Sequence, residues 1–262
     1  MHLDKIRIKQ SFAKASDTYD KVAELQRSAG RMLLHSVEES AFEGAILDLG
    51  CGTGFLTGEL LGYKIPETLL VLDIALAMVQ TTKAKFSNEK SVRYICGDAE
   101  HLPVAEQVFD SVFSNLALQW CRNLDAVFID IKRILKPHGY FVFSTFGPQT
   151  LQELKSAWAG VDDFNHVNTF FSQVQLKQFL EQAGFKEIQL TSTLYKPRYE
   201  SVELLMKALK QLGAQQVLRG RNKCLTTKTA MQRMMIAYET YREEGTVPAT
   251  FEVVSVIARS DC

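Results

Sequence analysis

One run of residues, 46–54 with the sequence ILDLGCGTG, constrains the fold of this chain more than any other feature. Ile46 to Leu49 form an apolar, strand-like segment that is followed at once by glycines at positions 50, 52 and 54. Glycine lacks a Cβ, so such a loop can adopt positive φ angles and bring its backbone close to a ligand. The run therefore predicts a buried strand, a sharp turn and a helix, with the turn at the carboxyl edge of a parallel sheet, where ligands bind.

The glycine spacing separates this loop from a dinucleotide-binding fingerprint. The pattern G-x-G-x-x-G would need a glycine at position 55, and the chain has Phe55. An acidic residue about 20 positions further on, which can accept both ribose hydroxyls, is present as Asp73 after the apolar run 69–72. We therefore expect an adenosine-bearing cofactor, with an NAD-dependent oxidoreductase as the weaker alternative.

Composition and charge limit the classes of protein to which this chain can belong. The chain has 262 residues, 46% of them hydrophobic, and 30 basic against 30 acidic residues. This length allows one decorated domain, and the zero net charge gives no sign of a nucleic-acid or membrane partner. The N-terminus has no apolar signal segment, and the five cysteines are scattered without a C-x-x-C pair. We expect a soluble, cytoplasmic monomer without a metal site.

Strand-like apolar runs alternate with segments that can form helices, which predicts a parallel sheet. Helices are expected at 125–135, where apolar residues recur at helical spacing, and after Ser172, which begins a capping box with Gln175. The strands are expected at 45–49, 69–73, 91–96, 111–114 and 140–146, with final strands at 188–195 and 251–258.

The segment 196–248 interrupts this alternation and is basic. It contains ten Lys or Arg residues against five Glu. Two helices are expected within it, at 202–212 and 228–242, and they belong to no repeating strand–helix unit. We interpret the segment as a helical lid insertion over the mouth of the active site.

Polar residues follow the third and fourth strands at the same predicted edge of the sheet. Asp98 stands in a CGDA turn and supplies a carboxylate that can accept a hydrogen bond from an adenine amino group. The fourth strand runs into a loop in which Asn115, Gln119 and Trp120 are candidates for the wall of a substrate pocket. A capping role for Asp98 and a core role for Trp120 are the alternatives.

These motifs together resemble the class I S-adenosylmethionine-dependent methyltransferases: the D-x-G-x-G-x-G loop, the acidic end of the second strand, the GDA turn, and LKPHGY at 135–140. The resemblance implies a Rossmann-like, seven-stranded, mostly parallel sheet with an antiparallel last strand and helices on both faces. It implies S-adenosylmethionine as cofactor and S-adenosylhomocysteine as product. The implied cofactor-binding residues are Asp48, Gly50, Cys51, Gly52 and Gly54, then Asp73 for the ribose, Ile74, Met78 on the adenine, Asp98 and Ala99 at the adenine edge, and Asn115 and Leu116.

A narrower resemblance extends over nearly the whole chain. The segments 11–20, 115–120, 143–151 and 166–168 look like those of malonyl-acyl carrier protein O-methyltransferases of biotin synthesis, with Ser16 as a small departure where alanine is expected. The resemblance implies methylation of the free carboxylate of a malonyl thioester, on acyl carrier protein or coenzyme A. The methyl ester would then enter fatty-acid-type elongation toward a pimeloyl group. The resemblance also implies one methyltransferase domain made of an N-terminal helical cap (1–40), a cofactor-binding core (41–195), the lid insertion (196–248) and a final strand (249–262).

The expected chemistry needs no acid or base residue, because a malonyl carboxylate is already ionised near pH 7. The task of the enzyme is mainly orientation. Phe12, Ala15, Tyr19, Ala23 and Gln26 would share one helical face that closes over the cofactor, with the Tyr19 hydroxyl near the methyl group or the acceptor.

An arginine from the insertion would hold one oxygen of the substrate carboxylate. Arg221 is the first candidate and Arg198 the second, and a solvated surface arginine is the alternative for each. Two other functions stay open: another small-molecule methyltransferase, acting on a carboxylate or a quinone precursor, and a non-catalytic module that binds S-adenosylmethionine.

Overall fold

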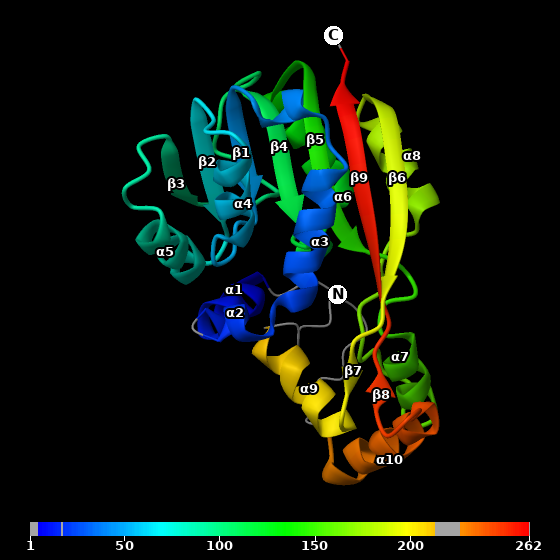
Figure 1. Ribbon diagram of the computed structural model, residues 1–262. Helices are drawn as coiled ribbons and strands as arrows, with labels where there is room; N and C mark the ends of the chain where they lie inside the picture. Colours follow the sequence, from blue (N-terminus) through cyan, green and yellow to red (C-terminus); the bar gives the residue numbers. More distant parts are fainter. Residues whose placement is uncertain (1–4, 17, 213–225, 262) are drawn as a thin grey trace.

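Within residues 5–16, 18–212 and 226–261, which the structure describes, seven strands form one sheet in the order β3-β2-β1-β4-β5-β9-β6 (Figure 1). The coordinates are those of a computed structural model. The strands are β1 (Ala45–Leu49), β2 (Thr68–Asp73), β3 (Val92–Cys96), β4 (Phe109–Asn115), β5 (Leu135–Phe146), β6 (Phe185–Tyr195) and β9 (Phe251–Ser260).

Strand β1 lies at the centre of the parallel part of the sheet. Ile46 of β1 is opposite Leu69 of β2 and Ser111 of β4, and four of the five residues of β1 are buried. Parallel strands covered on both faces form continuous apolar runs of this kind. β9 runs antiparallel to both β5 and β6. The predicted mostly parallel sheet with an antiparallel last strand is therefore confirmed.

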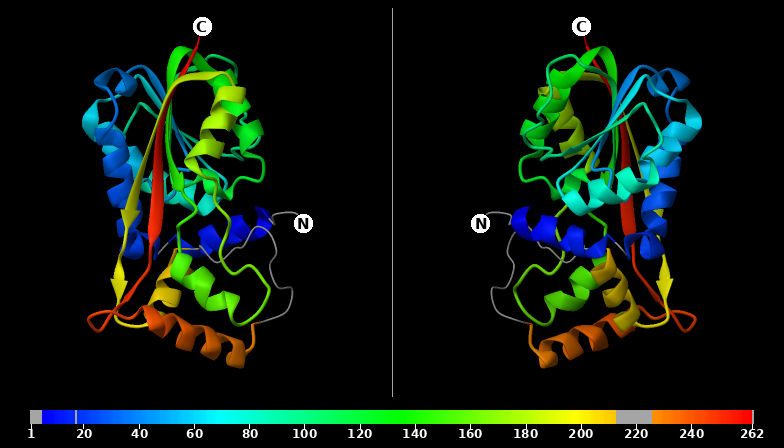
Figure 2. Two further views of the ribbon diagram at one scale, coloured as in Figure 1. Left: turned by 90° about the vertical axis from the view of Figure 1, so that its right-hand side faces the viewer. Right: turned by 90° about the vertical axis from the view of Figure 1, so that its left-hand side faces the viewer.

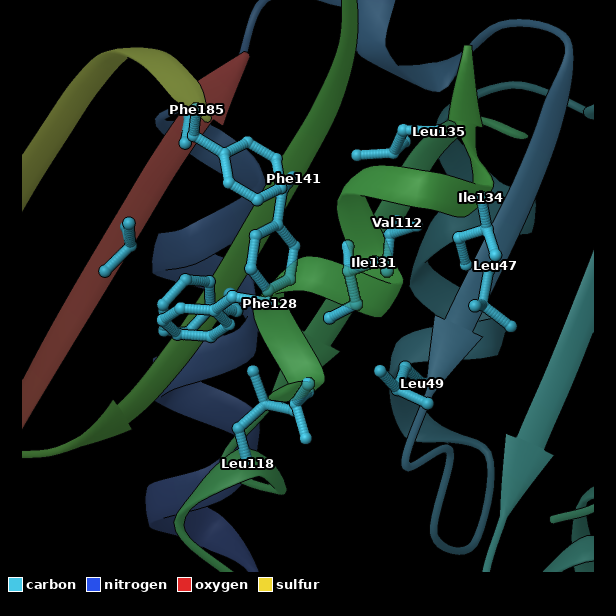
Figure 3. Packing of buried hydrophobic residues seen from close by; sticks show 14 of the residues in the cluster. Leu47, Leu49, Val112, Leu118, Phe128, Ile131, Ile134, Leu135, Phe141 and Phe185 are labelled. Carbon is cyan, nitrogen blue, oxygen red and sulfur yellow. The ribbon is translucent and has the colours of Figure 1, made fainter. Parts of the chain in front are cut away.

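Helices cover both faces of the sheet (Figure 2). On one face, α6 (Leu124–Ile134) and α8 (Gln173–Gln182) enclose an apolar cluster in which the rings of Phe128 and Phe141 lie 5.5 Å apart (Figure 3). On the other face, Phe42 and Phe113 belong to a second cluster. The helical elements of that face are α3 (Glu24–His35), the 3-10 turn η1 (Glu39–Phe42) and α4 (Phe55–Tyr63), while α5 (Leu76–Lys85) packs beside β2 and β3.

Two helices begin where the sequence predicts. The side chain of Asn123 accepts a hydrogen bond of 3.2 Å from the Ala126 amide at the start of α6. The predicted capping box is present at the start of α8, where the Ser172 hydroxyl and the Gln175 side chain each accept from the other residue's amide. Because these bonds satisfy amides at the first turn, local sequence is enough to fix both starts.

The N-terminal segment differs from the expected single helical face. It forms α1 (Lys5–Ala15), the short α2 (Tyr19–Val22) and α3. The Ser16 hydroxyl donates to the Ala13 carbonyl at 3.0 Å and the Thr18 amide donates to the Ala15 carbonyl at 2.9 Å, and these bonds end α1. As a result α1 and α2 lie beyond the end of the sheet to which β4 and β5 point (Figure 1), while α3 packs on β4 and β5.

The described residues between β6 and β9, together with α7, build a small lobe at the same end of the molecule as α1 and α2 (Figure 1). Its core contains Trp158, Leu205, Met234 and Tyr238, all buried. Because Trp158 belongs to α7, that helix packs in the lobe, although the expected division assigned it to the cofactor-binding core. The elements of the lobe are α7 (Gln152–Ala159), β7 (Arg198–Tyr199), α9 (Val202–Gln211), α10 (Lys228–Tyr238), η3 (Glu239–Tyr241) and β8 (Val247–Pro248).

None of the helices in the described ranges is long and apolar enough to cross a membrane.

Candidate functional site

The glycine loop between β1 and α4 requires its three glycines for different reasons. Gly50 has φ of +80°, and a Cβ on it would lie 2.3 Å from the Cβ of Ala117. Gly54 has φ of +90°, and its Cβ would lie 2.9 Å from the side chain of Thr82. Gly52, with φ of +54°, would meet no atom within 4 Å. Gly50 and Gly54 therefore allow close packing, whereas Gly52 leaves open space beside the loop.

That open space belongs to a cavity at the carboxyl ends of β1, β2 and β4. Its empty volume, which includes space open to solvent, is about 770 Å³. Helices α1 and α2 contribute to its wall. The lining residues are Lys5, Ile8, Phe12, Tyr19, Leu49, Gly50, Gly52, Leu72, Asp73, Ile74, Met78, Gly97, Asp98, Ala99, Asn115, Leu116, Ala117, Leu118, Trp120 and Cys121.

Asp73 at the end of β2 is joined directly to the glycine loop. One of its carboxylate oxygens accepts from the Gly52 amide at 3.0 Å, and the other accepts from the Ala75 amide at 2.8 Å. Burial raises the pKa of Asp73, and these backbone bonds oppose the shift. Each carboxylate oxygen has a further lone pair, so Asp73 can still accept bonds from two ribose hydroxyls. The loop and this carboxylate thus fit the predicted cofactor.

Asp98 after β3 pairs with a residue that sequence reasoning missed. Lys5 of α1 lies 2.5 Å from Asp98 and 2.6 Å from Glu100. Burial alone would raise the pKa of Asp98, but the hydrogen bond and charge of Lys5 hold it below its usual range. Nothing local in the sequence identifies Lys5 as a partner, because 93 positions separate it from Asp98.

Both polar atoms of the Asn115 side-chain amide form hydrogen bonds within the protein. Its Nδ2 donates to the Gln26 carbonyl at 2.9 Å, and its Oδ1 accepts from the Ser144 hydroxyl at 2.7 Å. Leu116 has φ of +48°, and its amide donates to the Ser144 Oγ at 3.0 Å. These bonds fix the loop after β4, so that Asn115 and Leu116 both line the cavity.

The two other candidates in this loop lie differently. Trp120, in the 3-10 turn η2 (Leu118–Trp120), lines the cavity and meets the ring of Phe12 edge-on at 5.4 Å. Gln119 donates to the Leu116 carbonyl at 2.7 Å and does not line the cavity. Among the predicted wall residues Gln119 therefore stabilises the loop, while Trp120 and Phe12 pack on each other in the cavity wall.

A second cavity opens from the other side of the glycine loop. It shares Tyr19, Gly50, Gly52 and Asn115 with the first, so the two cavities are adjacent. Cys51 lines this second cavity. The further lining residues are Asp20, Ala23, Gln26, Arg27, Thr53, Phe55, Leu56 and Lys85.

Asp48 and Gly54 support the loop from behind and line neither cavity. Asp48 is completely buried and accepts from the Thr57 hydroxyl at 2.6 Å. Burial raises the pKa of Asp48 to about 7 against the effect of that bond. Asp48 thus holds the first turn of α4 and has no path to a ligand.

Of the two predicted substrate arginines, Arg198 is described and lies away from the cavities. Arg198 in β7 donates to the Thr246 hydroxyl at 2.8 Å and pairs with Glu243 at 3.2 Å. It lies in the small lobe and lines neither cavity. Arg221 lies outside the residues that the structure describes.

Comparison with known proteins agrees with the fold. Residues 47–143 match a family model described as "Methyltransferase domain". Similar folds occur in a putative methyltransferase from Bacillus halodurans C-125 (TM-score 0.63, 15% identity, covering 90% of this chain and 100% of that one) and in the YcgJ protein from Bacillus subtilis (TM-score 0.63, 13% identity, 90% and 98%). Fold and glycine-loop site together define a class I S-adenosylmethionine-dependent methyltransferase.

Relatives at higher identity indicate the family within this class. A malonyl-[acyl-carrier protein] O-methyltransferase from Gallionella capsiferriformans is 38% identical over 96% of this chain and 89% of its own. One from Methylococcus capsulatus is 38% identical over 94% and 90%. A biotin biosynthesis bifunctional protein BioHC from Cellvibrio japonicus is 37% identical over 97% of this chain and 50% of its own length. The chain belongs to the malonyl-[acyl-carrier protein] O-methyltransferase family.

The raised pKa of Asp48 predicts a pH-dependent stability. A carboxyl with a pKa of about 7 when folded and about 3.9 when unfolded stabilises the fold at low pH, and this stabilisation is lost as the pH rises through 7. Relative to Asp48→Asn, the wild type should lose about 2–3 kcal/mol of unfolding free energy between pH 5 and pH 8. Urea unfolding of both proteins measures this. The exposed Asp163→Asn is the control, and a pH-independent difference for Asp48→Asn would refute the assignment.

Proposed function

We propose that this protein transfers the methyl group of S-adenosylmethionine to the free carboxylate of a malonyl group on acyl carrier protein, forming the methyl ester used in biotin synthesis. The observation that carries the proposal is the identity of 38% over 96% of the chain to a malonyl-[acyl-carrier protein] O-methyltransferase. The cavity beside the glycine loop supports it, because it offers groups for an adenosine-bearing cofactor at one edge of the sheet.

The proposed cofactor contacts come from the end of β2, from α5 and from the loops that follow β1, β2, β3 and β4. Asp73 accepts the ribose hydroxyls, Met78 packs on the adenine, and Asp98 with Ala99 binds the adenine edge. Gly50 and Gly52 let the backbone approach the methionine part. Ile74 and Leu116 complete the apolar wall. Of the other residues predicted for this site, Cys51 lines the second cavity, and Asp48 and Gly54 act through the loop that they support.

The reaction needs orientation more than acid–base chemistry. The malonyl carboxylate is ionised near pH 7, so its oxygen can attack without a general base. The bound cofactor supplies a methyl group activated by the sulfonium charge. Ile8, Phe12 and Trp120 are apolar residues of the cavity wall. By excluding water they would strengthen the attraction between the carboxylate and the sulfonium.

Tyr19 is the proposed hydrogen-bond donor to the acceptor carboxylate. It lines both cavities, and its hydroxyl has no hydrogen-bond partner among the described residues. Burial, aided by the charges of Asp73 and Asp20, raises the pKa of Tyr19 well above its usual value. The hydroxyl therefore keeps its proton throughout the working pH range and can donate to a carboxylate oxygen that is not attacking.

We expect Tyr19→Phe to lower kcat/KM for the malonyl acceptor about tenfold, the effect of losing one hydrogen bond to a charged group. The affinity for S-adenosylhomocysteine should stay within twofold, because the aromatic ring remains. Steady-state kinetics and calorimetric titration measure the two effects. Tyr63→Phe, whose hydroxyl bonds to His35 on the surface at 2.9 Å, is the matched control. Unchanged kinetics for Tyr19→Phe would leave only a packing role for Tyr19.

One incubation tests cofactor, acceptor and bond type together. Purified protein is mixed with methyl-labelled S-adenosylmethionine and malonyl-acyl carrier protein, and the carrier is isolated. The label should be on the carrier and should be released by mild base as expected for a methyl ester. Free malonate, a quinone precursor and carrier without malonate are the comparison acceptors. Preferential labelling of any of these, or none at all, would refute the proposal.

Exposed lysines of the small lobe suggest where the carrier protein docks. Lys207 and Lys210 lie on α9, which contacts α2 beside the cavity. Helix α1 adds Lys9 and Lys14 and contains no acidic residue. Three further basic positions of the insertion, Arg219, Arg221 and Lys223, lie outside the described residues. A partner with an acidic surface would be steered to this end of the molecule.

Methylation of malonyl-carrier protein should therefore fall more steeply with ionic strength than methylation of a short malonyl thioester, because salt screens exposed charges. Lys207→Glu with Lys210→Glu should raise KM for the carrier substrate several-fold and leave the short substrate unchanged. Lys177→Glu with Lys186→Glu, on α8 and β6, is the matched control. Equal salt slopes for the two substrates would mean that the carrier docks elsewhere.

A further inference from the structure

One face of α1 covers the end of the first cavity at which the adenine is proposed to bind. Lys5, Ile8 and Phe12 are spaced as neighbours on a helix, all three line this cavity, and Ile8 is only 3% exposed. Met78 and Asp98, two of the proposed adenine contacts, line the same cavity. Helix α1 also contacts α5, to which Met78 belongs. An adenine bound there would therefore be enclosed in part by α1.

Two ion pairs attach α1 to the loop after β3. The Lys5 Nζ lies 2.5 Å from a carboxylate oxygen of Asp98 and 2.6 Å from one of Glu100. The three side chains are 21%, 29% and 12% exposed, respectively. Fully exposed ion pairs contribute little to stability, but this cluster is largely shielded from water. Without the shared lysine, the two neighbouring carboxylates would repel each other, so Lys5 stabilises the loop as well as the position of α1.

Both carboxylates are also held by backbone groups, so they provide a fixed anchor. The second oxygen of Asp98 accepts from the Glu100 amide at 3.0 Å, and the second oxygen of Glu100 accepts from the Arg122 amide. Further along α1, the ring of Phe12 meets that of Trp120 edge-on at 5.4 Å. Helix α1 is therefore attached to two cavity loops, to one by charge and to the other by an aromatic contact.

We propose that Lys5 is a positioning residue that clamps α1 across the adenine end of the cofactor site, so that S-adenosylmethionine and its product enter and leave when the ion pairs to Asp98 and Glu100 open. This inference rests on the proposed use of S-adenosylmethionine. The ion pairs join two parts of the protein and need no ligand to form, so the clamp slows both entry and exit. A residue that only contacts the ligand would slow its exit alone.

The test compares rate constants as well as affinity. Stopped-flow mixing with S-adenosylhomocysteine gives the association and dissociation rate constants. Lys5→Met keeps an unbranched side chain and removes its charge. We expect dissociation from this variant to be about tenfold faster than from the wild type, the effect of losing a bond to a charged group. Association should be about fivefold faster, so that Kd changes only about twofold, which also shows that the variant is folded.

Charge variants separate the clamp from a loss of packing. Lys5→Arg keeps the charge and should have rate constants within twofold of the wild type. Lys5→Glu should exchange the ligand at least as fast as Lys5→Met. Lys5→Glu combined with Glu100→Lys should bring both rate constants back to within threefold of the wild type, because the swapped charges again join α1 to the loop. Lys9→Met, at an exposed position of α1 that lines neither cavity, is the matched control.

A fluorescence measurement tests the clamp without any cofactor. The chain has two tryptophans, Trp120 and Trp158, so Trp158→Phe leaves Trp120, beside Phe12, as the single reporter. With Lys5→Met in this background, α1 should detach from the cavity loops more often. Acrylamide should then quench the fluorescence of Trp120 about twofold more effectively than it does when Lys5 is present.

Three results would overturn the inference. The first is unchanged rate constants in Lys5→Met. The second is faster dissociation with unchanged association, which would mean that Lys5 only contacts the ligand. The third is unchanged quenching of Trp120. Failure of the wild type to bind S-adenosylhomocysteine would instead contradict the proposed function, and the quenching comparison would still test the clamp, so the two failures are distinguishable.

Discussion

The site depends on a short set of backbone bonds between the glycine loop and the end of β2. The Gly50 and Cys51 amides donate to the Leu72 carbonyl at 2.7 and 3.1 Å, and the Gly52 amide donates to the Asp73 side chain at 3.0 Å. These bonds require the chain to turn immediately after β1, and only glycine reaches the positive φ angles at 50 and 52 without strain. Because the loop is tied to Asp73, the groups proposed to bind the ribose and the methionine part are joined in one unit.

The N-terminal helices attach to this unit by contacts of different kinds. Lys5 pairs with Asp98 by charge, Phe12 packs on Trp120, and Asp20 accepts from the Thr53 hydroxyl at 2.5 Å. Each contact ends on a loop that also lines the cavity. Any rearrangement of α1 or α2 would therefore change the shape of the cavity proposed for the cofactor.

The sheet could be predicted from sequence because its signals are local. The apolar runs, the Ser172 capping box and Gly184, which has φ of +89°, each determine their own element. The break between α1 and α2 was missed because it depends on the Ser16 and Thr18 bonds to carbonyls, which compete with helical spacing.

The candidate site could be predicted only in part. Asp73 and Gly52 follow from the strand–loop pattern, but Lys5 and Arg27 reach the cavities through tertiary contacts that no spacing reveals. Arg198 was expected at the substrate because the insertion is basic. In the structure the described part of the insertion packs with α7 around one apolar core, and Arg198 is bound to Glu243 and Thr246.

The family motif at 143–151 forms a joint between the sheet and the small lobe. The Glu252 side chain accepts from the Gln149 amide at 2.8 Å and the Ser192 hydroxyl at 3.0 Å, while Glu153 of α7 accepts from the amide of Thr250 at 3.1 Å. A Cβ on Gly147 would lie 2.4 Å from the Glu252 carboxyl carbon.

Two buried carboxylates therefore fix the lobe to the ends of β5 and β9 by bonds to backbone amides. The resemblance at 143–151 thus reflects how the lobe is attached. A methyl transfer that needs no acid or base depends on how accurately its two reactants are aligned. The bonds of Glu252 and Glu153 hold the small lobe in a fixed place relative to the sheet, and the proposed methyl transfer would depend on such alignment rather than on a reactive side chain.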